Sequence, residues 1–348
     1  MTGEAATGMR ESGAAIGASG LRGRLPWAAA AAAVVFVVGA AAPMRFAGDF
    51  ALKLGGEGLL LGMLALSIAF LMRQAGLVAL GAASVYGGAG YLFSIAVGEW
   101  DLPATEALLL SLLIIAAYSA MLGALIVRTN PLAFMMLTLA AGEMISHGVI
   151  LEDLRDYTGG ADGLVVTFKG SILGLQAADF ANPARFWPVA WTTAWTAGLT
   201  IWAVRRSRLG TILRAVRGNE ERMRFSGFDT YAPRLIAFVI VNCVAAVCGL
   251  LHVLNAGFVS PESLGLSLST NALVAALIGG VASSAGPIVG GLIFSFAQDQ
   301  FGAHGLTQLF TGVSVVLFIV LFPRGVVGGL LSSAPIGGRP PGGRRESR

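Results

Sequence analysis

Apolar runs of about twenty residues recur along the whole chain, and they constrain its fold more than any other feature. A helix needs about 20 apolar residues to cross the hydrocarbon core of a bilayer, and the mean hydropathy of +0.76 agrees with such a pattern. The sequence therefore predicts an all-α polytopic membrane protein. The expected spans are 26–43, 54–72, 76–97, 103–127, 131–150, 187–204, 235–257, a broken region at 268–301, and 306–322.

The segments between these spans are short. The longest are the first 25 residues, 151–186, 205–234 and the last 25 residues, and none of them can bury a core of its own. This excludes a large soluble domain. We expect a cytoplasmic tail over 1–25, a transmembrane permease domain over 26–323, and a basic, disordered cytoplasmic tail over 324–348.

The basic residues indicate which side of the membrane each loop faces. With the broken region counted as a hairpin of two short helices, the chain makes about ten crossings and both termini are cytoplasmic. Of the 23 lysines and arginines, all but five then lie inside, as the positive-inside rule requires. The net charge of +4 thus follows topology and does not indicate nucleic-acid binding. We expect a multi-pass protein of the bacterial inner membrane.

Residues 26–43 allow two interpretations. Three arginines precede an alanine-rich run that ends at GAAA, as in a cleaved signal peptide. Polytopic inner-membrane proteins rarely need such a signal, so we favour a retained helix. Both interpretations leave the next segment outside, and the charge pattern therefore does not decide between them.

The region 268–301 is interrupted. Its halves, 268–281 and 287–301, reach only about 21 to 23 Å at about 1.5 Å per residue, less than the core of about 30 Å. The stretch between them, IGGVASSAGPIVGG, has backbone groups that are tolerated at membrane depth only against protein or a water-filled cavity. A transport pathway and a close contact of small-residue helices both fit. The pathway candidates here are Gly279, Gly280, Gly286 and Pro287.

A basic segment between two predicted spans is also amphipathic. Eight of the 23 basic residues fall between Arg205 and Arg234. Arg217 has glutamates at i+3 and i+4 with which it can pair, and Gly227 is placed for a left-handed C-cap. Such a helix either lies on anionic lipid or offers its apolar stripe to a groove on a soluble partner. The stripe consists of Leu209, Ile212, Leu213, Val216 and Met223.

The same segment contains a longer pattern. It reads S-x-x-G-x-x-x-x-A-x-R-x-N-E over 207–220 and is followed by Gly227. This pattern resembles the cytoplasmic loop of permease subunits of branched-chain amino-acid ABC importers, the LivM type. The likeness extends over about 54–330, with further motifs in the family's order. They are LTLAAGEMI at 137–145, TGGADGL at 158–164, GFVSPES at 257–263, IGGVASSAGP at 278–287 and FPRGVVGGL at 322–330.

The resemblance implies a function and a set of partners. The chain is then half of the translocation pathway for branched-chain amino acids. It works with a second, LivH-like permease, two ABC ATPase subunits and an extracytoplasmic substrate-binding protein. Residues 211–226 are then the coupling helix that docks on an ATPase. Because the chain lacks a Walker A motif, ATP with Mg²⁺ is expected on the partners and no cofactor on this chain. The implied coupling residues are Gly210, Leu213, Ala215, Arg217, Asn219, Glu220 and Gly227.

The chain departs from the family pattern in three places. Thr211 replaces an arginine, and Val281 with Ala282 alters a glycine-rich run. The family's G-Q-x-S-L-G-H stretch reads GLVALGA at 76–82, so its polar positions are apolar here. If those positions shape the pathway, the substrate differs. Urea and short amides, which close relatives carry, therefore stay open beside branched-chain amino acids.

Polar residues within the spans are further candidates. Glu143 and His147 lie at i and i+4 in the fifth span, after Thr138, and ionisable groups in spans default to functional hypotheses. A pathway role competes there with simple pairing or hydration. For the seventh span we expect hydrogen bonds between helices. The residues concerned are Asn242, His252 and Asn255.

The remaining signals favour no enzyme. TGGADGL lacks the end of a phosphate loop, and we expect a structured outer turn that docks the binding protein. Cys243 and Cys248 are expected to be buried thiols, and the three histidines form no catalytic or metal-binding pattern. A self-sufficient secondary transporter is the alternative function. The residues of the outer turn are Thr158, Gly159, Gly160, Asp162 and Gly163.

Overall fold

A computed structural model describes residues 25–46, 48–168, 170–172, 174–281, 283–302 and 312–313. Most of them are helical, and the strands found among them are only two residues long, which confirms the all-α prediction. The predicted last span and both predicted tails lie almost entirely outside the described residues.

The chain divides into two units, 1–48 and 49–348. The described part of the first unit is essentially one helix, α2 (Leu25–Phe46), of 22 residues with Pro43 near its end. Its bounds include the predicted span 26–43. A run of six alanines near its start favours a helix, because alanine has the highest helix propensity.

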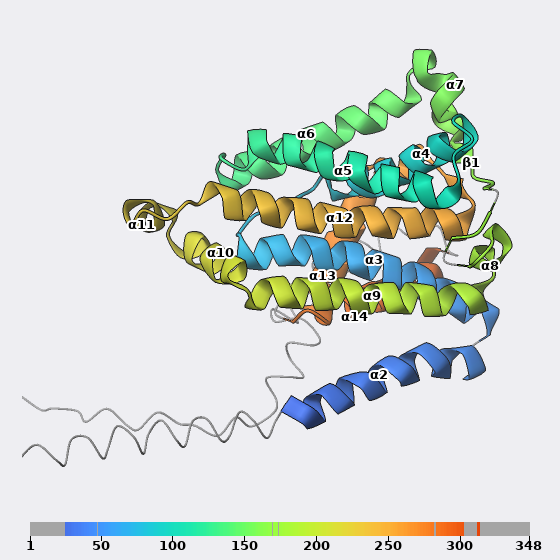
Figure 1. Cartoon of the computed structure of the whole chain (residues 1–348), viewed down its shortest axis with the longest axis horizontal. Helices are drawn as coiled ribbons and strands as arrows, with labels where there is room; N and C mark the ends of the chain where they lie inside the picture. The colour runs from blue at the N-terminus through green and yellow to red at the C-terminus, as the bar shows by residue number, and fades with distance from the viewer. Residues whose placement is uncertain are drawn as a thin grey trace, which may run out of the picture. The chain divides into compact units, whose positions relative to one another are not determined.

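The second unit is a bundle of helices (Figure 1). Among the described residues, four helices are long and apolar enough to cross a membrane, so the chain is a multi-pass membrane protein. These four are α3 (Asp49–Gln74), α5 (Ala104–Ile126), α6 (Pro131–Ile150) and α12 (Tyr231–Ala256). The bundle also contains α4 (Ala82–Gly98), α9 (Pro183–Arg206), α13 (Leu266–Gly279) and α14 (Gly286–Gly302).

Helix α3 is the centre of this unit. It packs between α9 and α12 and also against α13 and α14 (Figure 1). In its most apolar window 94% of the residues are buried, against 17% for α6. Helix α6 therefore belongs to the outside of the bundle, and α3 to the core.

Close packing of α3 on α14 depends on glycine. A Cβ atom on Gly62 would lie 2.8 Å from Cα of Ile288, and one on Gly291 would lie 2.4 Å from Cα of Gly62. Contacts this short leave no room for a side chain, so the two backbones approach as they do in small-residue membrane interfaces.

Short elements gather at the two ends of the bundle (Figure 1). One end, named here the α10 end, carries α10 (Arg208–Gly218) and α11 (Glu220–Phe225). The other, named the β1 end, carries α7 (Arg155–Thr158), β1 (Leu164–Val165), α8 (Ala177–Ala181) and β2 (Phe258–Val259). The 3-10 turns are η1 (Glu152–Leu154), η2 (Gly160–Asp162) and η3 (Pro261–Leu264). The predicted basic loop and the predicted outer loop thus lie at opposite ends.

The third span is shorter than predicted, because residues 76–81 are not helical and α4 begins at Ala82. Gly76 has φ +69°, a conformation that residues with a side chain rarely adopt. A Cβ atom on Gly81 would lie 2.1 Å from the carbonyl oxygen of Thr138. Leu77 and Ala79 are nevertheless buried in the core. Because buried loop residues and residues of a spanning helix are both apolar, the sequence pattern did not distinguish them.

Candidate functional site

The apolar stripe of α10 faces the bundle. Leu213 is 0% exposed and lies in the core cluster that also contains Leu77 and Phe238. Val216 is also buried, at 2% exposed. Burying an aliphatic side chain of this size contributes about 1.5–3 kcal/mol. These two side chains therefore contact neither lipid nor a soluble partner. For them, both predictions about the stripe are wrong.

The predicted helix over 211–226 is two helices. Asn219 lies between α10 and α11 in an extended conformation, with φ −162° and ψ 101°, and its side chain accepts a hydrogen bond from the backbone N–H of Arg222 at 2.9 Å. This is the N-cap arrangement that asparagine favours. In the sequence, Asn219 is followed by two glutamates, and an N-cap residue followed by acids in the first turn is a signal for the start of a helix.

The break changes the partner of Glu220. Its carboxylate pairs with Arg234 at 2.8 Å, and the hydroxyl of Thr230 donates to it at 3.4 Å. Arg234, at the start of α12, has a side chain only 6% exposed. Within the described structure Arg217 pairs with neither Glu220 nor Glu221, so the predicted helical pairs are wrong.

Arg217 instead binds the end of α3. Its guanidinium donates to the backbone carbonyl of Arg73, and its Cγ lies 3.1 Å from the position of a Cβ on Gly76. The guanidinium of Arg73 in turn donates to the carbonyl of Val281, at 3.5 Å. A continuous series of contacts therefore runs from α10 through the end of α3 to the turn between α13 and α14. Sequence reasoning missed Arg73 in this role.

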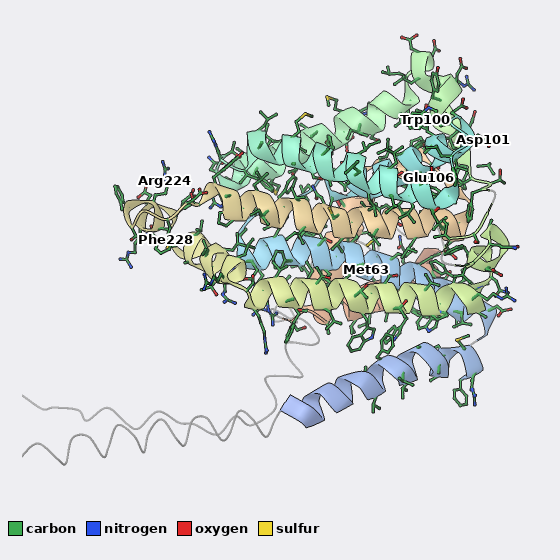
Figure 2. The ribbon with its side chains drawn as sticks, viewed as in Figure 1. Met63, Trp100, Asp101, Glu106, Arg224 and Phe228 are labelled. Atoms are coloured by element: carbon green, nitrogen blue, oxygen red, sulfur yellow. The ribbon has the colours of Figure 1, made fainter. Side chains whose placement is uncertain are left out.

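Gly227 ends α11 as predicted. It has φ +79°, its N–H donates to the carbonyl of Arg224 at 3.0 Å, and the N–H of Phe228 donates to that of Met223 at 3.1 Å. This is a Schellman motif. The turn leaves Phe225 91% exposed and Phe228 54% exposed. Figure 2 shows Phe228 at the same end of the molecule as Arg224, an arginine that sequence reasoning did not select.

Two of the remaining coupling candidates differ in exposure. A Cβ atom on Gly210 would lie 2.4 Å from the carbonyl oxygen of Arg205, so glycine allows α10 to fold against the end of α9. Ala215 is exposed on α10. Gly210 therefore shapes the loop from within, while Ala215 is free to meet a partner.

The pathway candidates fall in two places. Thr138 is buried on α6, while Glu143 and His147 form an exposed pair farther along it, with Oε2 and Nε2 3.7 Å apart. The other four lie at the interruption between α13 and α14. There a Cβ atom on Gly279 would lie 1.8 Å from the carbonyl oxygen of Gly286. The interrupted region is thus confirmed, and protein covers it in a close small-residue contact.

The predicted outer turn is ordered by its own residues. The hydroxyl of Thr158 lies 2.7 Å from the carbonyl oxygen of Val149, and it accepts from the N–H of Gly160 at 3.3 Å. Arg155 and Asp162 form an ion pair at 3.3 Å. Three glycines have positive φ, which allows the tight turn. They are Gly159 at +72°, Gly160 at +60° and Gly163 at +74°.

The outer turn is joined to the GFVSPES motif. Strand β1 pairs with β2 in antiparallel register, with Leu164 opposite Val259. A Cβ atom on Gly163 would lie 2.3 Å from the carbonyl oxygen of Val259, so this close approach also requires glycine. Two motifs far apart in the sequence therefore form one small surface at the β1 end.

Helix α8 begins with a charged cap. Asp179 accepts from the backbone N–H of Gln176 at 2.9 Å, and it also pairs with Arg185. The hydrogen bond from Gln176, together with the positive charge of Arg185, lowers the pKa of the Asp179 carboxyl.

Two polar residues of the predicted seventh span contact neighbouring helices. Asn242 Nδ2 donates to the hydroxyl of Ser119 at 3.1 Å, a buried hydrogen bond between α12 and α5 as predicted. The ring centroids of His252 on α12 and Tyr86 on α4 lie 5.5 Å apart. Cys243 and Cys248 are free thiols. Among the described residues no group of acidic, histidine or cysteine side chains is arranged to hold a metal ion.

The helices and their ends define an integral membrane protein with a basic, ordered loop at one end and a glycine-rich turn at the other. The family described as "Branched-chain amino acid transport system / permease component" matches residues 50–322. The chain belongs to this family of permease components.

Individual proteins that are similar to this chain are also permeases. The high-affinity branched-chain amino acid transport system permease protein LivH of Salmonella typhimurium is 28% identical over 192 residues, which cover 53% of this chain and 62% of LivH. The corresponding LivM protein is 25% identical over 288 residues, covering 76% of this chain and 67% of LivM. The autoinducer 2 import system permease protein LsrC of Escherichia coli is 28% identical over 145 residues, covering 41% of this chain and 40% of LsrC.

The chain thus spans about three-fifths of the LivH proteins that it matches, 62% of their length. Among solved structures, "PsaBC from Streptococcus pneumoniae in complex with Fab" covers 85% of this chain and 99% of its own, with 14% identity and a TM-score of 0.39.

Proposed function

We propose that this chain is a transmembrane permease subunit of a bacterial ABC importer for branched-chain amino acids. Its family supports this assignment, as does its similarity to LivH and LivM, which are permease proteins of branched-chain amino acid transport systems. The chain itself catalyses no reaction and binds no cofactor. ATP with Mg²⁺ binds to two separate ATPase subunits, which drive transport through the chain.

The proposal includes a topology in the inner membrane. The chain crosses about ten times with both termini inside, so that loop 205–234 is cytoplasmic and loop 151–186 is outside. The four apolar helices and the position of the two loops at opposite ends of the bundle support this arrangement. The permease domain then covers 26–323.

The contact series Arg217–Arg73–Val281 is the observation that carries the coupling proposal. Arg217 belongs to α10, and Val281 belongs to the interruption between α13 and α14. A displacement of α10 by an ATPase therefore reaches the interrupted region through two hydrogen bonds to backbone carbonyls. This gives an ATPase a mechanical route to a segment that can line the pathway.

The docking face is the tip of α11. Because Leu213 and Val216 of the stripe are buried, the most exposed apolar side chains of the loop are Phe225 and Phe228, with exposures of 91% and 54%. Arg222 and Arg224 flank them. An ATPase groove with an apolar floor and acidic rim matches this tip, since aromatic and arginine side chains dominate such interfaces.

A second permease covers α6. Only 17% of the residues in the most apolar stretch of this helix are buried. The exposed residues of the helix include the ionisable pair Glu143 and His147. Ionisable side chains that face lipid are costly, so protein or a water-filled pathway is the better neighbour for this face. The LivH-like subunit and this chain then enclose the pathway between them. The extracytoplasmic binding protein docks on the β1 end.

The substrate is proposed from the family. The apolar residues at 76–82, which leave urea and short amides open, include Leu77, Ala79 and Ala82, and all three are buried in the core. Their apolar character therefore fits packing, and branched-chain amino acids remain the leading assignment.

Affinity purification of the tagged full chain from its native membrane tests the coupling proposal. We expect an ATPase subunit to be recovered with the unsubstituted chain and lost with the double variant Phe225→Ala/Phe228→Ala. Phe50→Ala, which removes an exposed phenylalanine from the start of α3, is the matched control and keeps the ATPase. Uptake of leucine and of urea by the intact complex then separates the two substrates.

Two results would contradict the proposal. Recovery of the ATPase with both phenylalanines removed places its docking site elsewhere. A chain that is recovered alone and transports solute without ATP after reconstitution is a secondary transporter, and the importer assignment then fails.

A further inference from the structure

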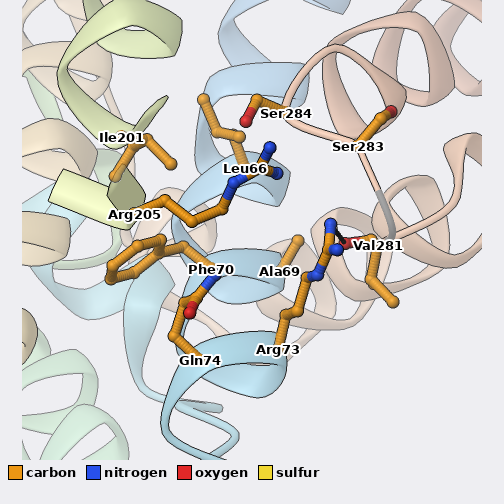
Figure 3. A pocket seen from close by; sticks show the side chains of 10 residues that line it. All are labelled: Leu66, Ala69, Phe70, Arg73, Gln74, Ile201, Arg205, Val281, Ser283 and Ser284. Atoms are coloured by element: carbon orange, nitrogen blue, oxygen red, sulfur yellow. Dashed lines mark hydrogen bonds between the residues drawn. The ribbon is translucent and has the colours of Figure 1, made fainter. Parts of the chain in front are cut away.

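A narrow pocket lies at the α10 end, where α3 and α9 end and the turn between α13 and α14 begins (Figure 3). Arg73 and Gln74 of α3, Arg205 of α9 and Ser284 of the turn line it. Its cavity volume is about 10 Å³, room for about one water-sized atom and far too little for an amino acid. An amino acid therefore does not fit in this pocket.

The pocket holds positive charge without a counter-ion. Arg73 makes one long hydrogen bond, 3.5 Å, to the carbonyl of Val281. Among the described residues no carboxylate lies within ion-pair distance of either Arg73 or Arg205. Arg214 and Arg217 are also close enough to Arg73 to repel its charge. Guanidinium groups gathered in this way attract an oxyanion, which they bind through paired N–H groups.

Hydrogen-bonding groups in the pocket also lack partners. Gln74 is 1% exposed, and its Oε1 has no hydrogen bond within the described structure; the buried Oγ of Ser284 has none either. A buried polar atom without a partner costs about 1–3 kcal/mol, so such atoms indicate an absent ligand or water. The hydroxyl of Ser284 can donate to an anion, and the Gln74 amide can donate after a rotation of 180°.

The turn adds a helix N-terminus. The N–H of Gly286, the first residue of the 17-residue α14, donates to the hydroxyl of Ser283 at 2.8 Å. Backbone N–H groups at such a terminus favour negative charge nearby. The dipole of α14 therefore acts in the same direction as the two arginines.

Residues near the pocket are of the kinds found at a membrane interface. Near the same end of α9, Trp202 is 39% exposed and Arg206 lies over its ring at 4.3 Å. Exposed tryptophan beside arginine is typical of the membrane interface, where lipid phosphates lie. On the proposed topology this is the inner leaflet.

We propose that this pocket binds a phosphate group. One phosphate oxygen enters between Arg73, Arg205 and Ser284, and the rest of the ligand stays outside. Either the phosphodiester of an anionic phospholipid headgroup or free inorganic phosphate offers this chemistry. The ligand then joins the ends of α3 and α9 to the interruption between α13 and α14.

The test uses the full chain in nanodiscs of phosphatidylcholine, with and without added phosphatidylglycerol. Native mass spectrometry after detergent extraction counts the retained phosphatidylglycerol. Equilibrium dialysis with radiolabelled phosphate, on the phosphatidylcholine discs, measures binding of the free ion. Retention of phosphatidylglycerol without phosphate binding identifies a headgroup site, and phosphate binding identifies a site for the free ion.

Variants show whether the pocket is responsible. We expect Arg73→Gln and Arg205→Gln each to weaken binding by about fivefold or more, and Ser284→Ala by about threefold or more without a change of charge. Arg208→Gln, which removes the same charge from an exposed residue of α10, should stay within about twofold. Thermal unfolding of each variant shows that it is folded, and Arg205→Gln is the cleanest because it removes no hydrogen bond found in the described structure.

The proposal is overturned if the unsubstituted chain binds neither probe. It is also overturned if Arg208→Gln weakens binding as much as Arg205→Gln, because the effect is then one of net charge, or if Ser284→Ala and both pocket arginine variants bind normally.

Discussion

At the scale of single residues, two charged side chains fix α10 and α11 to the bundle. Arg217 donates to the carbonyl of Arg73, and Glu220 pairs with Arg234 at 2.8 Å. The Arg234 side chain is 6% exposed and its Nε has no partner within the described structure, so its charge depends on Glu220. The position of the loop therefore rests on a few polar contacts.

Glu220→Ala is expected to lower the free energy of unfolding by about 1–3 kcal/mol, because it leaves the Arg234 guanidinium buried and unpaired. Glu221→Ala removes the same charge from an exposed neighbour and should change it by less than about 0.5 kcal/mol. Thermal and detergent unfolding measure both. The double variant Glu220→Ala/Arg234→Met should recover part of the loss. Equal losses in the two single variants would contradict this account.

Asp179 gives a prediction for pH. Its folded pKa is lowered by the hydrogen bond from Gln176 and the charge of Arg185, below the ordinary value of 3.8. The contribution of this carboxylate to stability is therefore present above pH 3.8 and is lost as the pH falls through the folded pKa. We expect amides 177–181 to lose protection from hydrogen exchange only in that acidic range. In Asp179→Asn their protection should not depend on pH there, and a persisting acid transition would exclude Asp179 as its cause.

At the scale of elements, apolar length and helix signals predicted most helices, because hydrophobic spans and caps are local properties. Asn130 caps α6 by accepting from the N–H of Ala133 at 2.8 Å, and this helix has the predicted bounds. The start of α4 and the bend at Asn219 were missed. Leu77 and Ala79 are buried in the core although residues 76–81 are not helical, and the partner of Glu220 lies on another helix. Such tertiary contacts are not visible in periodicity.

The contact between α3 and α14 predicts the effect of one methyl group. Gly62→Ala should cost about 1–3 kcal/mol, because its Cβ would lie 2.8 Å from the backbone of Ile288 and the helices must separate. Gly148→Ala, on α6, has no atom within 4 Å of the new Cβ and should be neutral or stabilising by up to about 1 kcal/mol. Thermal unfolding of both variants in one detergent makes the comparison. Equal stabilities would mean that α3 and α14 do not pack this closely.

At the scale of the whole molecule, the candidate site was predicted in part. The motifs identified the basic loop and the outer turn, because family patterns retain residues at functional surfaces. They did not reveal that Leu213 is buried, that Arg217 binds α3, or that Phe225 and Phe228 form the tip. Those properties depend on how the loop folds back on the bundle, and no spacing within the loop encodes them.

The proposed topology predicts opposite accessibility for the two ends. In a chain with Cys243 and Cys248 replaced by serine, Asp156→Cys is expected to react with an impermeant maleimide in intact cells. Arg224→Cys and Ser347→Cys should react only after the membrane is opened, because both lie on the cytoplasmic side. Replacing the cysteines without further change gives the background. Labelling of Ser347→Cys in intact cells would place the C-terminus outside and reject the proposed topology.

The central position of α3 has a consequence for biosynthesis. Arg73 and the Val281 carbonyl that it contacts are separated by 208 residues, so α14 emerges from the ribosome long after α3. At about 5–20 residues per second this interval is about 10–40 s. During that time the glycine-lined face of α3 has entered the bilayer without the helix that later covers it. The nascent chain thus depends on the insertion machinery, or on lipid, to occupy this face until the C-terminal helices arrive.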